Sequence, residues 1–203
     1  MPAMHETSGR EVKVVAFNGS PRKDGNTAVL IGYVLRELEA QGIETELVQL
    51  AGQTLAGCRN CGTCARLQDR HCHGHRGDSM NDYIDLMLAA DGVIIGSPVY
   101  FADVTANTKA LIERAGYAAR KGGNPLKRKV GAAVVAARRA GALHALDTIN
   151  HFFAVAEMIV PGSTYWNLGI GQAVGEVEQD DEGVETMQNL GRIMAWLLKR
   201  LHA

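Results

Sequence analysis

The residues best suited to chemistry are four cysteines, the only ones in the chain, which all fall between positions 58 and 72. Two residues separate Cys58 from Cys61 and Cys61 from Cys64, and seven more precede Cys72. Thiolates bind iron–sulfur clusters and zinc, and four is the number that a [4Fe-4S] cluster needs. One short run would cross-link a chain of 203 residues poorly. The spacing therefore indicates a ligand or redox site in a reducing compartment.

Three other interpretations of the cysteine run are open. The neighbouring His71, His73 and His75 would allow a zinc site with the upstream thiols. Cys61 and Cys64 have the spacing of a redox disulfide. The run would otherwise be a reduced, mobile loop that binds no metal.

A second group with binding chemistry is the polar loop at 18–27, which reads Asn-Gly-Ser-Pro-Arg-Lys-Asp-Gly-Asn-Thr. It joins an apolar run to the start of a predicted helix, where free N–H groups and the helix dipole favour an anion. Gly25 is followed by Asn26 and Thr27, so the lysine of a nucleotide-hydrolysing P-loop is missing, as is a G-x-G-x-x-G motif. The loop suits a phosphate that is held rather than transferred; the alternative is a capped helix behind a Gly-Pro turn.

Two further loops carry groups that would flank a flat ring. The first follows an apolar run and contains Pro98, Val99, Tyr100 and Phe101; the second contains Arg138 and Gly141 after the next apolar run. Aromatic side chains, backbone amides and a cation in such loops would contact a bound ring system. The alternatives are a turn whose aromatic rings pack on a neighbouring helix and a solvated basic turn.

Alternating elements are needed to position these loops. Apolar periodicity predicts strands at 12–17, 44–50, 92–96 and 129–137, with a fifth beginning at 158–160. It predicts helices at 27–40, 79–90, 106–119, 143–157 and 184–202, with long loops at 51–77 and 162–182. Asn26 or Thr27 is the expected N-cap of the first helix, and Gly42 lies just past its end.

This alternation predicts a single α/β domain over residues 1–203. Parallel strands need crossover helices, which gives a doubly wound, five-stranded parallel sheet with helices on both faces. Ligands of such sheets lie outside the carboxyl ends of the strands, where the strand order reverses. The loops after the first, third and fourth strands are therefore the expected binding site.

The composition excludes several classes of partner. The chain has 21 Lys and Arg against 22 Asp and Glu, so it lacks the basic surplus that nucleic acids or anionic membranes attract. The first 13 residues have no apolar segment typical of an export signal, and no run is long and apolar enough to span a membrane. We expect a cytoplasmic protein that binds neither nucleic acid nor membrane.

The polar loop and the loop after the third strand resemble those of the NAD(P)H-dependent FMN reductases, within the flavodoxin-like superfamily. The resemblance rests on Gly19-Ser20-Pro21-Arg22, Gly25-Asn26-Thr27 and Gly96-Ser97-Pro98-Val99-Tyr100-Phe101, and it extends through 109–114 into the loop at 138–141. It implies a flavodoxin-like fold in which Ser20, Arg22, Asn26 and Thr27 hold the FMN phosphate. Pro98, Val99, Tyr100, Phe101, Arg138 and Gly141 would surround the isoalloxazine ring.

The implied function is an oxidoreductase that passes electrons from NAD(P)H through FMN to a quinone, a nitro- or azo-aromatic compound or free flavin. FMN carries the chemistry, so no catalytic side chain is expected. A dimer or larger homo-oligomer that closes over the flavin is also expected.

The cysteine run resembles that of the iron-sulfur flavoproteins, a branch of the same superfamily. This resemblance implies the alternative function, an electron carrier whose [4Fe-4S] cluster on Cys58, Cys61, Cys64 and Cys72 relays single electrons between FMN and a redox protein such as ferredoxin. A flavin-free binding module that keeps the fold is the third hypothesis.

Overall fold

The computed structural model describes residues 11–203, and the expectation about an export signal falls mainly on residues outside this part. A five-stranded sheet forms the centre, with strand order β2-β1-β3-β4-β5 and every neighbouring pair parallel. The strands are β1 (Lys13–Asn18), β2 (Glu44–Gln49), β3 (Gly92–Pro98), β4 (Val130–Ala137) and β5 (Leu168–Ile170). This is the flavodoxin strand order, so the predicted fold class is confirmed.

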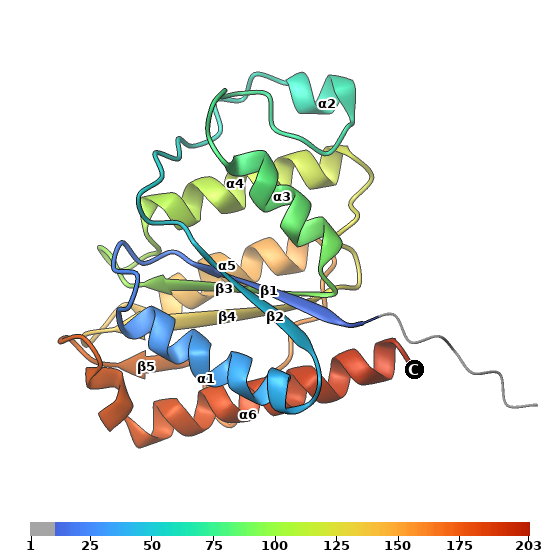
Figure 1. The fold of residues 1–203 in the computed structure, drawn as a ribbon. Helices are drawn as coiled ribbons and strands as arrows, with labels where there is room; N and C mark the ends of the chain where they lie inside the picture. The colour runs from blue at the N-terminus through green and yellow to red at the C-terminus, as the bar shows by residue number, and fades with distance from the viewer. Residues whose placement is uncertain (1–10) are drawn as a thin grey trace, which may run out of the picture.

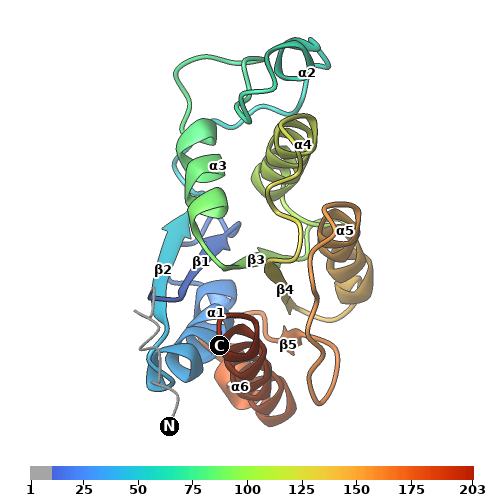
Figure 2. The ribbon, with the colours of Figure 1, turned by 90° about the vertical axis from the view of Figure 1, so that its right-hand side faces the viewer.

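Helices cover both faces of the sheet (Figure 1), and the end-on view in Figure 2 separates the two helical layers. One layer contains α3 (Met80–Ala89), α4 (Ala106–Lys121) and α5 (Ala142–Val155). The other contains α1 (Asn26–Ala40) and α6 (Asp181–Leu201). Within residues 11–203, no helix combines the length and the apolar character that crossing a membrane requires.

Strands β1, β3 and β4 are buried on both faces, and their side chains alternate between two cores. In β1, Val15 and Phe17 pack toward α3, α4 and α5, while Val14 and Ala16 pack toward α1 and α6. All eight residues of β4 are buried. Continuous apolar runs are expected in parallel strands that are covered on both faces, which is why strands β1, β3 and β4 were recognisable in the sequence.

The fifth strand was predicted in the wrong place. Residues 158–160 contribute only one isolated bridge, between Ile159 and Val130, and the strand that extends the sheet is β5. Pro161 follows directly, and proline cannot donate the hydrogen bond that would continue a ladder. Residues 168–170 therefore form the edge strand of the sheet, and they lie beside the carboxyl end of β4.

Two long loops contain short helices that periodicity did not reveal. The cysteine-bearing loop includes α2 (Thr63–Leu67), and the segment after β5 includes the 3₁₀ helix η1 (Glu176–Gln179). Each is about one turn long, which is too short to produce a periodic apolar pattern.

The predicted N-cap of α1 was also wrong, because Gly25 occupies that position and Asn26 and Thr27 are the first helical residues.

Candidate functional site

A cavity of about 160 Å³ lies at the carboxyl ends of the strands. It is lined from the loop after β1 by Ser20, Arg22, Gly25, Asn26 and Thr27, from β3 and its loop by Pro98, Val99 and Tyr100, and from β4, β5 and their loops by Ala136, Arg138, Gly171 and Gln172. The lining joins segments far apart in sequence at the point where the strand order reverses. This is where the sequence predicted a ligand site.

The loop after β1 is held in shape by the neighbouring strands. The Gly19 N–H donates to the Gly96 carbonyl on β3 at 2.8 Å, and the Asn18 side-chain amide donates to Gln49 Oε1 at 2.7 Å. A Cβ atom at Gly19 would lie 1.9 Å from Thr108 Oγ1. The loop can approach α4 this closely only because position 19 has no side chain.

The start of α1 supplies hydrogen-bond donors without partners. Its first N–H groups have no intrahelical acceptor, and the helix dipole adds positive potential there. The Thr27 side chain is 1% exposed, and its Oγ1 has no hydrogen-bond partner among the described residues. A buried hydroxyl is normally paired, so the missing partner is best supplied by an anionic ligand in the cavity. These donors fit a phosphate.

Asn26 also has a structural connection that the sequence did not reveal. Its side-chain amide donates to the Ala173 carbonyl at 2.8 Å and its Oδ1 accepts the Gly175 N–H at 2.8 Å. The Glu176 carboxylate accepts the backbone N–H groups of Gln172 and Ala173, and these bonds lower the pKa of Glu176. The segment after β5 is thereby held against the start of α1.

The loop after β3 forms a tight turn at the cavity rim. Tyr100 and Asp103 exchange two backbone hydrogen bonds, of 2.8 and 3.0 Å, and both central residues, Phe101 and Ala102, have positive φ. The Phe101 side chain is fully exposed and does not line the cavity. The Tyr100 side chain is half-exposed at the rim. The turn therefore projects one aromatic ring beside the cavity and another into solvent.

Gly141 lies behind this turn rather than in the cavity. Its φ is 86°, and a Cβ atom there would lie 2.8 Å from the Ala102 Cα atom. Glycine is therefore required both by the backbone conformation and by the contact between the loops after β3 and β4.

Eight of the ten residues predicted for the cofactor site line the cavity, all except Phe101 and Gly141. The predicted set omitted four residues that line the cavity, namely Gly25, Ala136, Gly171 and Gln172. Gly171 and Gln172 follow β5, and they were missed because the fifth strand was placed ten residues too early. The Gly169-Ile170-Gly171 pattern was the available signal for a strand ending near the site.

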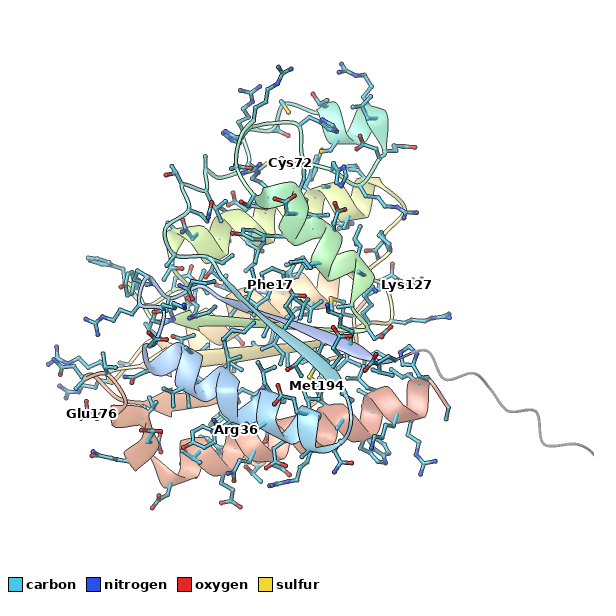
Figure 3. The ribbon with its side chains drawn as sticks, viewed as in Figure 1. Phe17, Arg36, Cys72, Lys127, Glu176 and Met194 are labelled. Carbon is cyan, nitrogen blue, oxygen red and sulfur yellow. The ribbon has the colours of Figure 1, made fainter. Side chains whose placement is uncertain are left out.

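The cysteine loop lies elsewhere, at the far end of the layer formed by α3 and α4. Figure 3 shows Cys72 above α3 and Glu176 at a separate edge of the molecule. All four cysteines are free; Cys64 and Cys72 are buried, whereas Cys58 and Cys61 are exposed. None of the residues that line the cavity comes from this loop. The described residues thus contain two distinct candidate sites.

The environments of the cysteines differ. The backbone N–H and the hydroxyl of Thr63 lower the pKa of the Cys61 thiol. Burial raises the pKa of Cys64, and the nearby thiols of Cys72 and Cys58 act in the same direction. A Cβ atom at Gly74 would lie 3.7 Å from both the Cys61 and the Cys72 sulfur. The four thiols therefore occupy one region of the loop.

Two neighbouring residues of α4 hold this loop. The Cys58 N–H donates to Glu113 Oε2 at 3.1 Å, and Arg114 Nε donates to Cys72 Sγ at 3.1 Å. The Arg114 guanidinium also pairs with both carboxylate oxygens of Asp78. Sequence reasoning did not single out these residues, because their contacts join segments more than 35 positions apart.

The three histidines of the loop each have a protein partner at Nε2. His71 pairs with Asp85, His73 with Asp69, and His75 with the Gly57 carbonyl, at 2.8 to 2.9 Å. Within residues 11–203, no three His, Cys, Asp or Glu side chains are grouped as one metal ion requires. A [4Fe-4S] cluster sets a different requirement, because each of its four thiolates binds a separate iron. The four free thiols match that donor set.

A polar hollow of about 900 Å³ adjoins the cysteines. Its lining includes Cys72 and a group of cationic or titratable side chains, namely Arg59, Arg66, Arg76, His73 and His75. The surface beside the cysteine loop is therefore rich in basic groups.

The sheet order and the phosphate-suited cavity define this protein as an α/β protein of the flavodoxin type. The family model described as NADPH-dependent FMN reductase matches residues 12–173. An iron-sulfur flavoprotein of Methanocaldococcus jannaschii is 37% identical over 195 residues, which cover 93% of this chain and 98% of the relative. The chain belongs to the NADPH-dependent FMN reductase family, in its iron-sulfur flavoprotein branch.

Other comparisons agree with this assignment. An iron-sulfur flavoprotein of Methanosarcina thermophila is 33% identical over 190 residues, covering 93% of this chain and 96% of the relative. A solved flavodoxin from the domain Archaea superposes with a TM-score of 0.61 at 14% identity, over 93% of this chain and 99% of the flavodoxin, and supports the fold alone. Family membership makes the protein an FMN-binding oxidoreductase.

Proposed function

We propose that this protein is an electron-transfer flavoprotein that holds FMN in the cavity and a [4Fe-4S] cluster on the cysteine loop. The observation that carries the FMN site is the buried, unpartnered hydroxyl of Thr27 beside the free N–H groups of α1. These donors, with Ser20 and Arg22, would bind the FMN phosphate. Asn26 would contribute its backbone N–H while its side chain holds the segment after β5.

The residues at the ends of β3 and β4 would receive the isoalloxazine ring. Pro98, Val99 and Tyr100 line one part of the cavity, and Arg138 lines another. A cation and backbone amides near the ring favour its reduced, anionic form. Phe101 and Gly141 would act less directly, Phe101 from the exposed tip of the turn and Gly141 by allowing the loops to pack together.

The cysteine loop would hold the cluster through Cys58, Cys61, Cys64 and Cys72. The donor set is the supporting observation, since all four are free thiols within one loop. The hydrogen bonds from Thr63 favour the thiolate of Cys61, which is the form that binds iron. The names of the relatives at 37% and 33% identity agree with this assignment.

FMN accepts a hydride or releases electrons one at a time, so it would connect a two-electron donor to one-electron carriers. The protein would orient the ring and tune it. NAD(P)H is the proposed two-electron donor, in keeping with the description of the family. A redox protein such as ferredoxin, acting inside the cell, is the proposed one-electron partner.

A second function is supported by the open rim of the cavity. Tyr100 is half-exposed and Phe101 is fully exposed, which would leave a flat surface for a small aromatic acceptor. Under this alternative the protein would pass electrons from NAD(P)H to a quinone, a nitro- or azo-aromatic compound or free flavin.

Anaerobic reduction of the FMN-loaded protein tests these functions. NADPH, NADH and reduced ferredoxin are each added while the visible spectrum is recorded, and a quinone is then supplied. Rapid flavin bleaching by reduced ferredoxin, dependent on intact cysteines, supports the electron carrier. Bleaching only by NAD(P)H, with quinone reduction that survives Cys64→Ser, supports the second function. No bleaching by any donor would contradict both.

A further inference from the structure

We propose that Arg114 is a positioning residue that fixes Cys72 and raises the reduction potential of the cluster. This inference rests on the proposed function, because it requires a cluster on the cysteine loop. Arg114 lies on α4 and is 1% exposed, and it is the largest fully buried side chain of the described residues. A buried guanidinium is costly to desolvate and needs compensating partners.

The partners of Arg114 join both ends of the cysteine loop. Its Nε donates to Cys72 Sγ at 3.1 Å, and its Nη1 donates to the Ala56 carbonyl at 3.3 Å. Its Nη1 and Nη2 form a two-pronged ion pair with Asp78. One side chain thereby holds Ala56, two positions before the first cysteine, together with the last cysteine and Asp78, just before α3.

The contact with sulfur is the informative one. Asp78 already balances the positive charge, and apolar side chains could fill the same space at less cost. A neutral thiol is a weak hydrogen-bond acceptor, whereas a thiolate bound to iron carries negative charge. An N–H group aimed at Cys72 Sγ at 3.1 Å therefore suits a sulfur that bears charge.

The same contact predicts a direction for the redox effect. Reduction adds one electron, and therefore one negative charge, to the cluster and its sulfur ligands. A guanidinium N–H at Cys72 stabilises the reduced form more than the oxidised form, and this raises the reduction potential. The Asp78 carboxylate acts in the opposite direction, since its negative charge lies just beyond the guanidinium.

Redox titration of two variants separates this role from a purely structural one. Iron, sulfide and FMN are quantified in anaerobically purified wild type, Arg114→Gln and Asp78→Asn, and the cluster is titrated with an electrode and mediator dyes. Arg114→Gln is expected to lower the equilibrium constant for one-electron reduction about tenfold, which is about 59 mV. Asp78→Asn is expected to raise this equilibrium constant. Arg36→Gln, whose guanidinium lies over the Tyr33 ring on α1, is the control and should not shift it.

Shifts of the same sign in both variants, or no shift in either, would overturn the proposal. If Arg114→Gln does not fold, Arg114→Lys replaces it, because lysine keeps the charge but cannot make the three-way contact. Arg114→Lys is expected to retain iron. Compared with wild type, its cluster should have a lower reduction potential, and its backbone amides across residues 56–78 should exchange hydrogen faster. Wild type that lacks iron would contradict the proposed function. Hydrogen exchange across residues 56–78 that is equally fast in Arg114→Lys and in wild type would refute the positioning role.

Discussion

At the scale of single residues, the hydroxyl of Thr27 gives a test of the phosphate assignment. It is buried without a partner, while the Thr27 methyl group packs toward Gly96 on β3. Thr27→Val keeps that methyl group and replaces the hydroxyl by a second methyl group, which cannot form a hydrogen bond. We expect FMN binding to weaken roughly ten- to hundredfold, as for loss of a hydrogen bond to a charged group. Titration of apoprotein with FMN, followed by flavin fluorescence, measures the change.

The Thr27→Val apoprotein should not lose stability, although its FMN affinity should fall. Removal of an unpaired buried hydroxyl leaves the free energy of unfolding equal or higher. Thr45→Val, on β2 and away from the cavity, is the matched control and should leave FMN affinity unchanged. Unaltered affinity in Thr27→Val would refute the assignment.

The ion pair between Asp78 and Arg114 predicts a pH dependence of stability. Hydrogen bonds from Arg114 hold the pKa of Asp78 below its ordinary value of 3.8. A depressed carboxyl pKa stabilises the folded state above about pH 4, and this contribution is lost as the pH falls through the folded-state pKa. Asp78→Asn should therefore destabilise the protein at pH 7, by on the order of 3 kcal/mol.

Urea denaturation at pH 7 and at pH 3 measures this effect. The difference between wild type and Asp78→Asn should narrow at pH 3, because the unfolded wild-type chain then takes up a proton at Asp78, whose ordinary pKa is 3.8, whereas the folded protein resists protonation there. A difference that stays constant between the two pH values would show that the ion pair contributes nothing to acid sensitivity.

Single residues differed in how well the sequence revealed them. Ser20, Thr27, Pro98 and the four cysteines were found because their types and local spacing suit a ligand. Arg114 was not singled out, since an arginine near the middle of an amphipathic helix usually lies in solvent. Its burial depends on Ala56, Cys72 and Asp78, and no local pattern encodes such contacts.

At the scale of elements, the loop between β1 and α1 depends on its close approach to α4. A Cβ atom at Gly19 would lie 1.9 Å from Thr108 Oγ1 and 2.8 Å from the Gly96 carbonyl oxygen. Gly19→Ala is therefore expected to cost about 1 to 3 kcal/mol and to weaken FMN binding. Chemical denaturation and FMN titration measure the two effects.

Gly162→Ala is the control for this prediction. Position 162 is exposed and has no positive φ, and a Cβ atom there would lie in open space, with no packing neighbour within 4 Å. Its free energy of unfolding should stay within about 0.5 kcal/mol of wild type, or rise slightly. Equal stability of Gly19→Ala and wild type would contradict the packing described for this loop.

Most elements were predictable, and the exceptions have physical causes. Strands β1, β3 and β4 are buried on both faces, so they appear as unbroken apolar runs. β5 has only three residues, of which one is buried, and its place was assigned to the more apolar residues at 158–160. α2 could not be seen because its five residues are too few to show a periodic apolar pattern.

At the scale of the whole molecule, the two sites lie on different parts of the fold (Figure 3). The cavity is open at its rim, and Tyr165 and Trp166 form a half-exposed aromatic pair just before β5. Closure of an open flavin site by a second subunit is the physical reason to expect a dimer or tetramer. Light scattering of the FMN-loaded protein should give at least twice the mass of one chain. A monomer that retains FMN would contradict this expectation.

The architecture as a whole followed from the sequence because alternation of strands and helices allows few topologies. Right-handed crossovers and burial on both faces lead to a doubly wound sheet, and the ligand position follows from the reversal of strand order. The organisation of residues 1–203 as one domain stays a prediction. The [4Fe-4S] cluster on the cysteine loop also stays a prediction, because composition and periodicity do not encode which group four thiols bind.

Two separate redox centres are proposed for one chain, and their stoichiometry tests this proposal. Iron, acid-labile sulfide and FMN are measured in protein purified without oxygen, for wild type and for Cys64→Ser. We expect about four iron and four sulfide per chain with one FMN in wild type, and loss of iron but not of FMN in Cys64→Ser. Wild type without iron and sulfide, or a variant that loses FMN together with its iron, would contradict it.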